Sequence, residues 1–220
     1  MLSLSTSSSI ASFITLFLAY LLTIGFMGFF NAWIGKIVGD STAEDRGLLT
    51  LDPLAHFDPI GFLCLLLSGI GWSKIVPIQI NRIVEPFRKL KIAVALFGET
   101  VLGLLLALLG MIIAFALGIR PYEAIAAEPS SLMLAVQMVL LSFIFLVLFM
   151  AIARFLYGTL LLIIMLLSKN NQSYAALLSE ISFFVVFILI LFFARYLQLL
   201  CLKGIVFLCA LLGQVTGLLT

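Results

Sequence analysis

The chain has few side chains of the kinds that bind metal ions or transfer protons, and they are dispersed. Its 220 residues contain a single histidine, His56, with Asp58 two positions later. A catalytic zinc ion usually takes three protein ligands and a water molecule. Because His56 and Asp58 stand two apart in a predicted turn, they could not easily bind one ion together. We expect Asp58 and the proline after it to set the turn, and His56 to hydrogen-bond to backbone. The cysteines lie in apolar runs without the spacing of a disulfide framework or zinc knuckle, and are expected to be buried as small hydrophobic residues: Cys64, Cys201 and Cys209.

Two further ionisable residues, Glu99 and Arg154, lie inside apolar stretches. A charge within a membrane is costly unless it is paired or hydrated. Glu99 stands eight residues beyond Lys91, a depth of about 12 Å in a helix that rises about 1.5 Å per residue. One interpretation is a functional polar pocket or partner-contact site that holds Glu99 and Arg154, with His56 and Asp58. The other is a structural ion pair, or side chains that reach the membrane surface from near a helix end.

The composition predicts which elements position these residues. Hydrophobic residues make up 64% of the chain and charged residues 10%, and the mean hydropathy is +1.32. A soluble domain has about 25% charged residues and could not hide so much apolar surface. We therefore expect an all-α polytopic membrane protein in contact with the lipid bilayer. The net charge of +2 and the lack of a basic patch interleaved with aromatic residues argue against a nucleic-acid partner.

The first half of the chain contains two apolar runs long enough to span a membrane. Residues 10–34 form the first, and we expect this helix to be retained because the start of the chain lacks the Lys or Arg of a signal peptide. Residues 60–70 are apolar but too short to cross, which predicts a re-entrant or irregular segment after the first helix. Residues 92–117 form the second span.

The second half predicts further spans, for a total of about four to five transmembrane helices. Residues 132–167 are apolar but interrupted by Arg154 and Gly158, which predicts one full span followed by a second, broken piece. Residues 175–194 and 199–219 are expected to form the C-terminal helices. With no soluble domain and no linker, residues 1–220 are predicted to form a single membrane domain.

The distribution of charge predicts how the chain is oriented. The loop at residues 72–91 is basic, which places it in the cytoplasm by the positive-inside rule. The loop at residues 118–131 is slightly acidic, and the N-terminus is uncharged, so both are expected outside. These assignments agree with one another if residues 60–70 do not cross, and the turn at His56 then lies near the membrane surface.

A long motif between the first two spans resembles a known family. Residues 39–43 read Gly-Asp-Ser-Thr-Ala, and residues 47–61 read Gly-Leu-Leu-Thr-Leu-Asp-Pro-Leu-Ala-His-Phe-Asp-Pro-Ile-Gly. This resembles the signature of short bacterial members of the site-2 protease family, G-D-x-T-A followed by G-R-L-T-L-N-P-x-x-H-x-D-P-x-G. The resemblance extends over roughly residues 20–195, and its specific part is residues 31–91. It implies a protease-like core at about residues 10–167, followed by the C-terminal helices at about 175–219.

Members of this family are intramembrane zinc metalloproteases with a His-Glu-x-x-His motif on a transmembrane helix. The two histidines bind zinc, and the glutamate is the general base. The resemblance places Met27, Gly28 and Asn31 at the positions of the first His, the Glu and the second His. The family's Leu-Asp-Gly segment, which gives the third ligand, corresponds to residues 156–158 and places Tyr157 at the aspartate. A Gly-Pro feature of the family falls near Glu99, which replaces the proline. We therefore expect no zinc, although the family uses it, and no catalytic residues.

Three functions remain open from the sequence. The first is a catalytically inactive site-2-protease-like protein that binds transmembrane segments or a partner membrane protein without cleaving them. The second is an active intramembrane metalloprotease, as family membership would suggest. The third is a small transporter or channel component that uses Glu99 and Arg154. The replaced zinc ligands favour the first and argue against an enzyme. The bacterial character of the resemblance predicts a location in the bacterial inner membrane.

Overall fold

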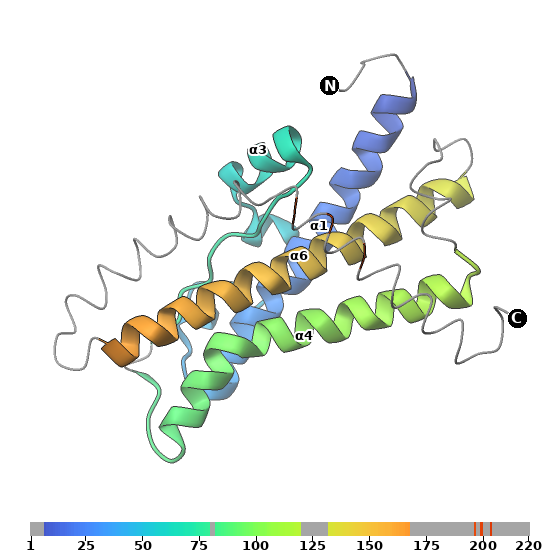
Figure 1. Cartoon of the computed structure of the whole chain (residues 1–220). Coiled ribbons are helices and arrows are strands. Elements are labelled where there is room, and N and C mark those ends of the chain that lie inside the picture. Colours follow the sequence, from blue (N-terminus) through green and yellow to red (C-terminus); the bar gives the residue numbers. More distant parts are fainter. Residues whose placement is uncertain are drawn as a thin grey trace, which may run out of the picture.

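The computed structural model describes residues 7–79, 82–119 and 132–167, together with the isolated residues 196, 199 and 203. The regular elements in these ranges are all helices, which confirms the predicted helical fold for this part of the chain (Figure 1). They are α1 (Ser7–Val38), α2 (Thr42–Asp45), the 3-10 helix η1 (Pro53–His56), α3 (Pro59–Ser68), α4 (Arg88–Ala116) and α6 (Leu132–Leu167). The predicted C-terminal spans, residues 175–194 and 199–219, lie outside the described residues except at these isolated positions.

Three of these helices are long and apolar enough to cross a membrane. The apolar parts are Ile10–Val38, Arg88–Ala116 and Leu132–Ile163, with 29, 29 and 32 residues. A span needs about 20 residues, so each of the three exceeds that length. α3 has only 10 residues and is too short to cross, as the sequence predicts. The described part of the chain therefore fits a multi-pass membrane protein.

The predicted interruption of the last of these helices is wrong, because α6 continues without a break from Leu132 to Leu167. A glycine inside a helix costs only about 1 kcal/mol relative to alanine, and at Gly158 the missing side chain allows close packing. A Cβ atom at this position would lie 2.8 Å from the carbonyl oxygen of Leu96 in α4. The charge of Arg154 does not end the helix either, since it forms an ion pair with Glu99 of α4.

α4 and α6 lie side by side and run antiparallel, and α1 crosses them (Figure 1). Close approach is possible because the buried face of α4 carries small residues: Ala95, Gly103, Ala107, Gly110 and Ala114. At Gly103 the three helices meet, since a Cβ atom there would lie 2.9 Å from Met27 of α1 and 3.2 Å from Ala151 of α6. Small residues at such interfaces are typical of helix packing in membranes.

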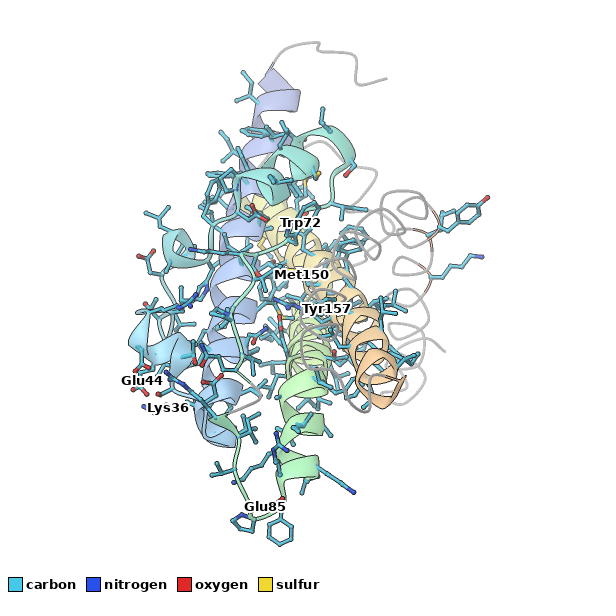
Figure 2. All side chains as sticks on the ribbon, turned by 90° about the vertical axis from the view of Figure 1, so that its left-hand side faces the viewer. Lys36, Glu44, Trp72, Glu85, Met150 and Tyr157 are labelled. Atoms are coloured by element: carbon cyan, nitrogen blue, oxygen red, sulfur yellow. The ribbon has the colours of Figure 1, made fainter. Side chains whose placement is uncertain are left out.

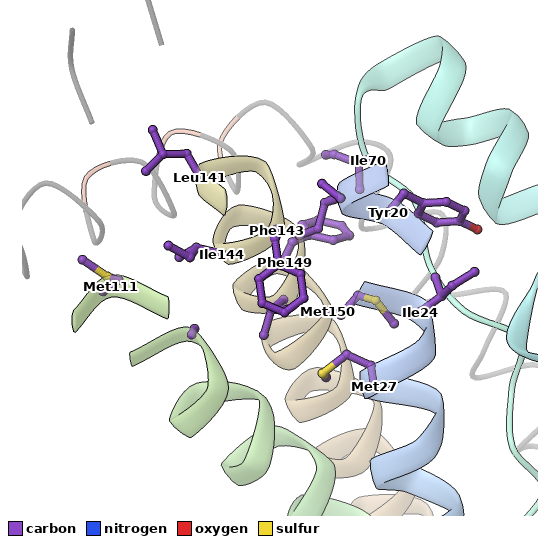
Figure 3. Packing of buried hydrophobic residues seen from close by; sticks show 14 of the residues in the cluster. Tyr20, Ile24, Met27, Ile70, Met111, Leu141, Phe143, Ile144, Phe149 and Met150 are labelled. Carbon is purple, nitrogen blue, oxygen red and sulfur yellow. The ribbon is translucent and has the colours of Figure 1, made fainter. Parts of the chain in front are cut away.

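The core between these helices is apolar and contains most of the large buried side chains. α1 contributes Tyr20, Ile24 and Met27, and they pack against α6 residues such as Phe149 and Met150 (Figure 3). The outward side of α4 carries large apolar residues that are exposed in the isolated chain: Leu104, Leu105, Leu108, Leu109 and Ile112. A lipid environment is the solvent that suits such a face.

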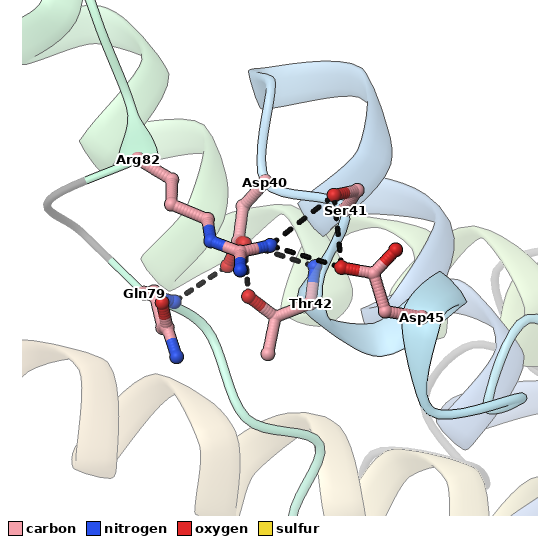
Figure 4. Close-up of polar contacts among 6 residues, drawn as sticks. All are labelled: Asp40, Ser41, Thr42, Asp45, Gln79 and Arg82. Carbon is pink, nitrogen blue, oxygen red and sulfur yellow. Dashed lines mark hydrogen bonds and ion pairs between the residues drawn. The ribbon is translucent and has the colours of Figure 1, made fainter.

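The segment between α1 and α4 leaves the end of α1 and returns to it. Asp40 accepts hydrogen bonds from the backbone N–H groups of Thr42, at 3.0 Å, and of Gln79 (Figure 4). Next to them, Arg82 forms an ion pair with Asp45 at 3.0 Å. The two ends of the segment are thereby fixed to each other at the C-terminal end of α1.

The middle of the same segment lies much further along α1. The ring centroids of Phe62 in α3 and Phe17 in α1 are 5.6 Å apart, and the Tyr20 hydroxyl donates to the Trp72 carbonyl at 3.0 Å. Tyr20 precedes the end of α1 at Val38 by about five turns, at about 3.6 residues per turn. The chain from Asp40 to Gln79 therefore runs back along α1 and then returns to the C-terminal end of that helix. We call this segment the excursion.

This arrangement divides residues 72–91, which the charge pattern predicts to be one loop, into two parts. Trp72 and Glu85 lie at different heights in Figure 2. Residues 70–79 have no regular secondary structure and run alongside α1, whereas the charged residues from Arg82 onward gather near the start of α4. The basic character of the loop comes mainly from its second part, and the charge pattern alone gives no signal for where the first part lies.

Candidate functional site

The three positions of the first protease motif lie on one side of α1 but have different surroundings. Met27 is fully buried in the apolar core, and its side chain contacts the position of Gly103 in α4. A thioether in this environment acts as packing material that fills an irregular space. Position 27 therefore belongs to the apolar core between the helices.

At the second motif position, Gly28, the imidazole of His56 occupies the space of a side chain. A Cβ atom built at position 28 would overlap with Cγ and Nδ1 of His56 and would lie 2.7 Å from its Cε1. The ring is fully buried, and its Nε2 is 2.9 Å from the carbonyl oxygen of Thr50. Since a carbonyl only accepts, Nε2 donates to it, and Nδ1 has no hydrogen-bond partner among the described residues. The glycine is thus required by the close approach of His56.

At the third position, Asn31 is part of a buried polar network with Glu99 and Arg154. The Asn31 Nδ2 group donates to Oε2 of Glu99 in α4, and the same oxygen lies 3.1 Å from Nε of Arg154 in α6. Glu99 is 3% exposed and Asn31 is 5% exposed. Each of the three long helices therefore contributes one member of a network with no net charge, and the network lies among apolar side chains.

A cavity of about 250 Å³ adjoins this network. Asn31, Glu99, Arg154 and Tyr157 all line it, and Tyr157 lies at mid-height in the molecule, away from the charged end marked by Lys36 and Glu44 (Figure 2). The remaining wall comes mainly from the irregular segment and from apolar residues of α4, including Ile75, Val76, Pro77, Ile78, Ile92 and Leu96. Two of the positions that the resemblance matches to zinc ligands, Asn31 and Tyr157, thus line the same cavity as Glu99 and Arg154.

Of the residues suggested as a polar pocket by the sequence, the structure brings together Glu99 and Arg154. His56 and Asp58 are not among the residues that line the cavity. Asp58 instead caps the start of α3, where it accepts a hydrogen bond from the Ile60 N–H at 3.1 Å and another from the Trp72 indole at 2.7 Å. His56 is packed against α1 at Gly28 and bonded to backbone, not placed at an exposed surface.

The wall formed by residues 75–78 is the part of the site that sequence reasoning misses. These residues contain no side chain with chemical function, and they belong to a stretch read as a loop. A signal was available in their apolar character, Ile-Val-Pro-Ile, which is unusual for a solvated loop. Apolar side chains in an irregular segment indicate that its backbone is buried against the protein.

The donor set at the cavity does not fit a zinc ion. Zinc in proteins is bound by Cys thiolate, His nitrogen or carboxylate oxygen, and Glu99 is the one such group among the residues that line the cavity. Its Oε2 already accepts from Asn31 and contacts Arg154. A guanidinium so close to the carboxylate would repel a dication in a medium of low dielectric constant. Across the described ranges, no three His, Cys, Asp or Glu side chains come together in a way that could hold a metal.

Comparisons with known proteins give a partial relationship. A protein of Bacillus subtilis (strain 168) named "Putative zinc metalloprotease YwhC" is 34% identical to this chain over 104 residues. The matched residues are 46% of this chain and 46% of that protein, so the chain matches less than half of the relative's length. No family model matches the chain, and no solved structure matches it. The similarity relates part of this chain to a protein named as a metalloprotease, in agreement with the resemblance in the sequence motif.

Proposed function

We propose that this chain is a site-2-protease-like membrane protein that has lost its zinc and its proteolytic activity, and that it binds transmembrane segments of partner membrane proteins. The observation that carries the proposal is the network of Asn31, Glu99 and Arg154. It lies where the resemblance places a zinc ligand, and a guanidinium cation is part of it. Arg154 compensates the charge of Glu99, so the site has no need of a metal for electrostatic balance.

The position of the general base supports the loss of catalysis. A glutamate at position 28 would need the space that His56 occupies. His56 is fully buried and bonded to Thr50, so its ring cannot move away without breaking that hydrogen bond. A glutamate here would thus require His56 to shift, and restoring the motif residues on α1 would still leave Tyr157 at the position of the third ligand and Arg154 beside the site, so it would not by itself restore a protease.

The surroundings of the cavity support the binding of a transmembrane segment. Its walls come from the three long helices and from an irregular segment rich in apolar side chains. Irregular backbone within a membrane is tolerated where it is buried in protein or lines a cavity. We place the middle of the excursion, around α3 (Pro59–Ser68), inside the membrane as a re-entrant segment. Its ends, where Glu44 and Asp45 pair with Lys36 and Arg82, lie in the cytoplasm by the positive-inside rule.

A reconstituted assay tests this function directly. The full chain is placed in lipid vesicles with a fluorescent transmembrane peptide and added zinc, and both the cleavage of the peptide and its association with the chain are measured. We expect association without cleavage. A control chain with Met27→His, Gly28→Glu and Asn31→His should also leave the peptide intact. Zinc-dependent cleavage by the natural chain that stops when a chelator is added would refute the proposal.

A further inference from the structure

Two buried acceptor atoms at the cavity have no hydrogen-bond partner among the described residues. They are Oε1 of Glu99 and Oδ1 of Asn31. Both residues line the cavity, and both are at least nine-tenths buried, at 3% and 5% exposed. Buried polar atoms are nearly always hydrogen-bonded. These two oxygens therefore indicate a donor that enters the cavity from elsewhere.

The orientation of the Asn31 amide is fixed by its neighbour. A carboxylate paired with Arg154 can only accept hydrogen bonds, so the Asn31 NH₂ group must face Glu99, as the structure shows. The amide oxygen then points away from that contact. Glu99 is similar, because its Oε2 is in contact with the donor groups of both Asn31 and Arg154, whereas its Oε1 accepts no hydrogen bond from either. Each residue thus uses one side for the network and keeps an acceptor on the other.

Arg154 adds hydrogen-bond donors to the same cavity. It contacts Glu99 through Nε, and a guanidinium carries four further N–H groups on its two terminal nitrogens. Its side chain is 17% exposed, so the group reaches the cavity that it lines. Within the described part of the chain, the residues that line the cavity therefore carry two unpaired acceptor oxygens and a set of donors, in a network whose formal charge is zero.

These features select among the chemical groups that a membrane segment could present. An ammonium group would bring a second positive charge beside Arg154. A carboxylate would face two acceptor oxygens with nothing to donate, and a hydroxyl has one proton for two acceptors. A primary carboxamide has two N–H donors and one carbonyl acceptor, which complements the two oxygens and the guanidinium.

We infer that the cavity binds the side-chain carboxamide of an Asn or Gln within a transmembrane segment of a partner protein. The inference rests on the proposed function and specifies the group that is recognised. The cavity volume of about 250 Å³ agrees with this, because it lies below the range of about 300–1,000 Å³ that is usual for whole small-molecule ligands. One side-chain head group with part of its stem is an occupant of suitable size.

The test compares model peptides that differ at one position. Leu- and Ala-rich transmembrane peptides of about 20 residues carry Asn, Leu, Ser or Lys at the centre. Each is labelled and incorporated with the labelled full chain into lipid nanodiscs, and association is measured by energy transfer. We expect the Asn peptide to associate about three- to tenfold more tightly than the Leu peptide, as interhelical hydrogen bonds do in membranes.

Two variants of the chain show whether the preference arises at this cavity. Asn31→Leu removes one of the acceptors and should reduce the preference for Asn over Leu to less than about twofold, below the effect of one interhelical hydrogen bond. Leu104→Ala changes an exposed residue of α4 outside the cavity and should leave the preference intact. The peptide series with the natural chain is decisive even if Asn31→Leu fails to fold.

The possible outcomes separate this inference from the proposed function. If Asn and Leu peptides associate equally, the cavity is filled by water or by the chain itself, and the inference fails while segment binding stands. If the Lys peptide associates best, an ammonium is the recognised group and the inference also fails. If no peptide associates at all, segment binding and the inference both fail.

Discussion

The excursion from Asp40 to Gln79 and the interior network at Asn31 both fall within the resemblance to a protease, but their polar residues work differently. In the excursion, carboxylates accept hydrogen bonds from backbone N–H groups, as Asp40 and Asp58 do. In the interior network, side chains from three helices bond to one another. Only the excursion keeps the motif that the family signature describes.

This difference between the excursion and the interior network indicates which parts of a protease-like fold depend on a bound metal. A carboxylate that caps backbone N–H groups stabilises a turn whether or not a zinc ion is nearby. The interior positions of a zinc site have no such independent role, so a change there requires a new set of partners. Under the proposed function, Glu99 and Arg154 are the partners that take the place of the metal in this chain, and the two regions should therefore respond differently to substitution.

The largest effect is expected when the interior network loses its cation. Arg154→Met leaves the buried Glu99 carboxylate without its ion pair, and removing one partner of a buried pair costs about 3–5 kcal/mol. The measurement is the free energy of unfolding in bicelles or micelles. The double variant Glu99→Leu/Arg154→Met is the control, and it should recover most of the loss because no unpaired charge remains. Equal losses in the single and double variants would show that the ion pair does not hold the site together.

A smaller loss is expected where the two regions touch, at Gly28 and His56. Gly28→Ala places a methyl group against the buried ring, and overpacking of this kind costs about 1–3 kcal/mol. In a double-mutant cycle with His56→Ala, the alanine at position 28 should become harmless, because the ring that it meets is gone. Additive losses in the cycle would mean that the close contact is absent in the membrane.

In the excursion, the loss of one capping carboxylate should cost less. Asp40→Ala removes the acceptor for the Thr42 and Gln79 N–H groups, and loss of a cap typically costs about 0.5–2 kcal/mol. Backbone hydrogen exchange at residues 42 and 79 should increase, while exchange near Asn31 should not change. Faster exchange throughout the interior network would show that the two regions are a single cooperative unit.

The smallest effect is expected for an exposed ion pair at the start of the excursion. Lys36 and Glu44 form an ion pair at 2.6 Å, but their side chains are 49% and 43% exposed. Exposed pairs contribute about 0–1 kcal/mol, so Lys36→Ala should change the free energy of unfolding by less than the Asp40 substitution does. A loss as large as that of Asp40→Ala would place the burial of the excursion, and thus its boundary, in question.

The sequence predicts the long helices well because lipid imposes a simple requirement on them. A helix of about 20 apolar residues spans the hydrocarbon core and pairs its own backbone N–H and C=O groups. α1 and α4 accordingly begin and end within a few residues of the expected bounds. The break expected in α6 was wrong because the pattern treats Arg154 and Gly158 as interruptions. Their partners, Glu99 and the backbone of Leu96, lie on another helix.

The candidate site was predictable in part. Intramembrane charge is so costly that Glu99 and Arg154 could be singled out and their pairing considered. The resemblance places Asn31 at the position of a zinc ligand, but nothing local shows that its amide contacts Glu99, which is far from it in the sequence. The contact of His56 with Gly28 likewise depends on the path of the excursion along α1. Such features are set by tertiary packing, which hydropathy and motif spacing do not contain.

Zinc content is the measurement that tests the central claim most directly. The full chain is purified, incubated with zinc, freed of excess metal and analysed by mass spectrometry, together with the variants Asn31→Leu and His56→Ala. The network of Asn31, Glu99 and Arg154 predicts substoichiometric zinc in the natural chain and no difference in the variants. One zinc ion per chain that is lost in either variant would contradict this account and return the metalloprotease function to first place.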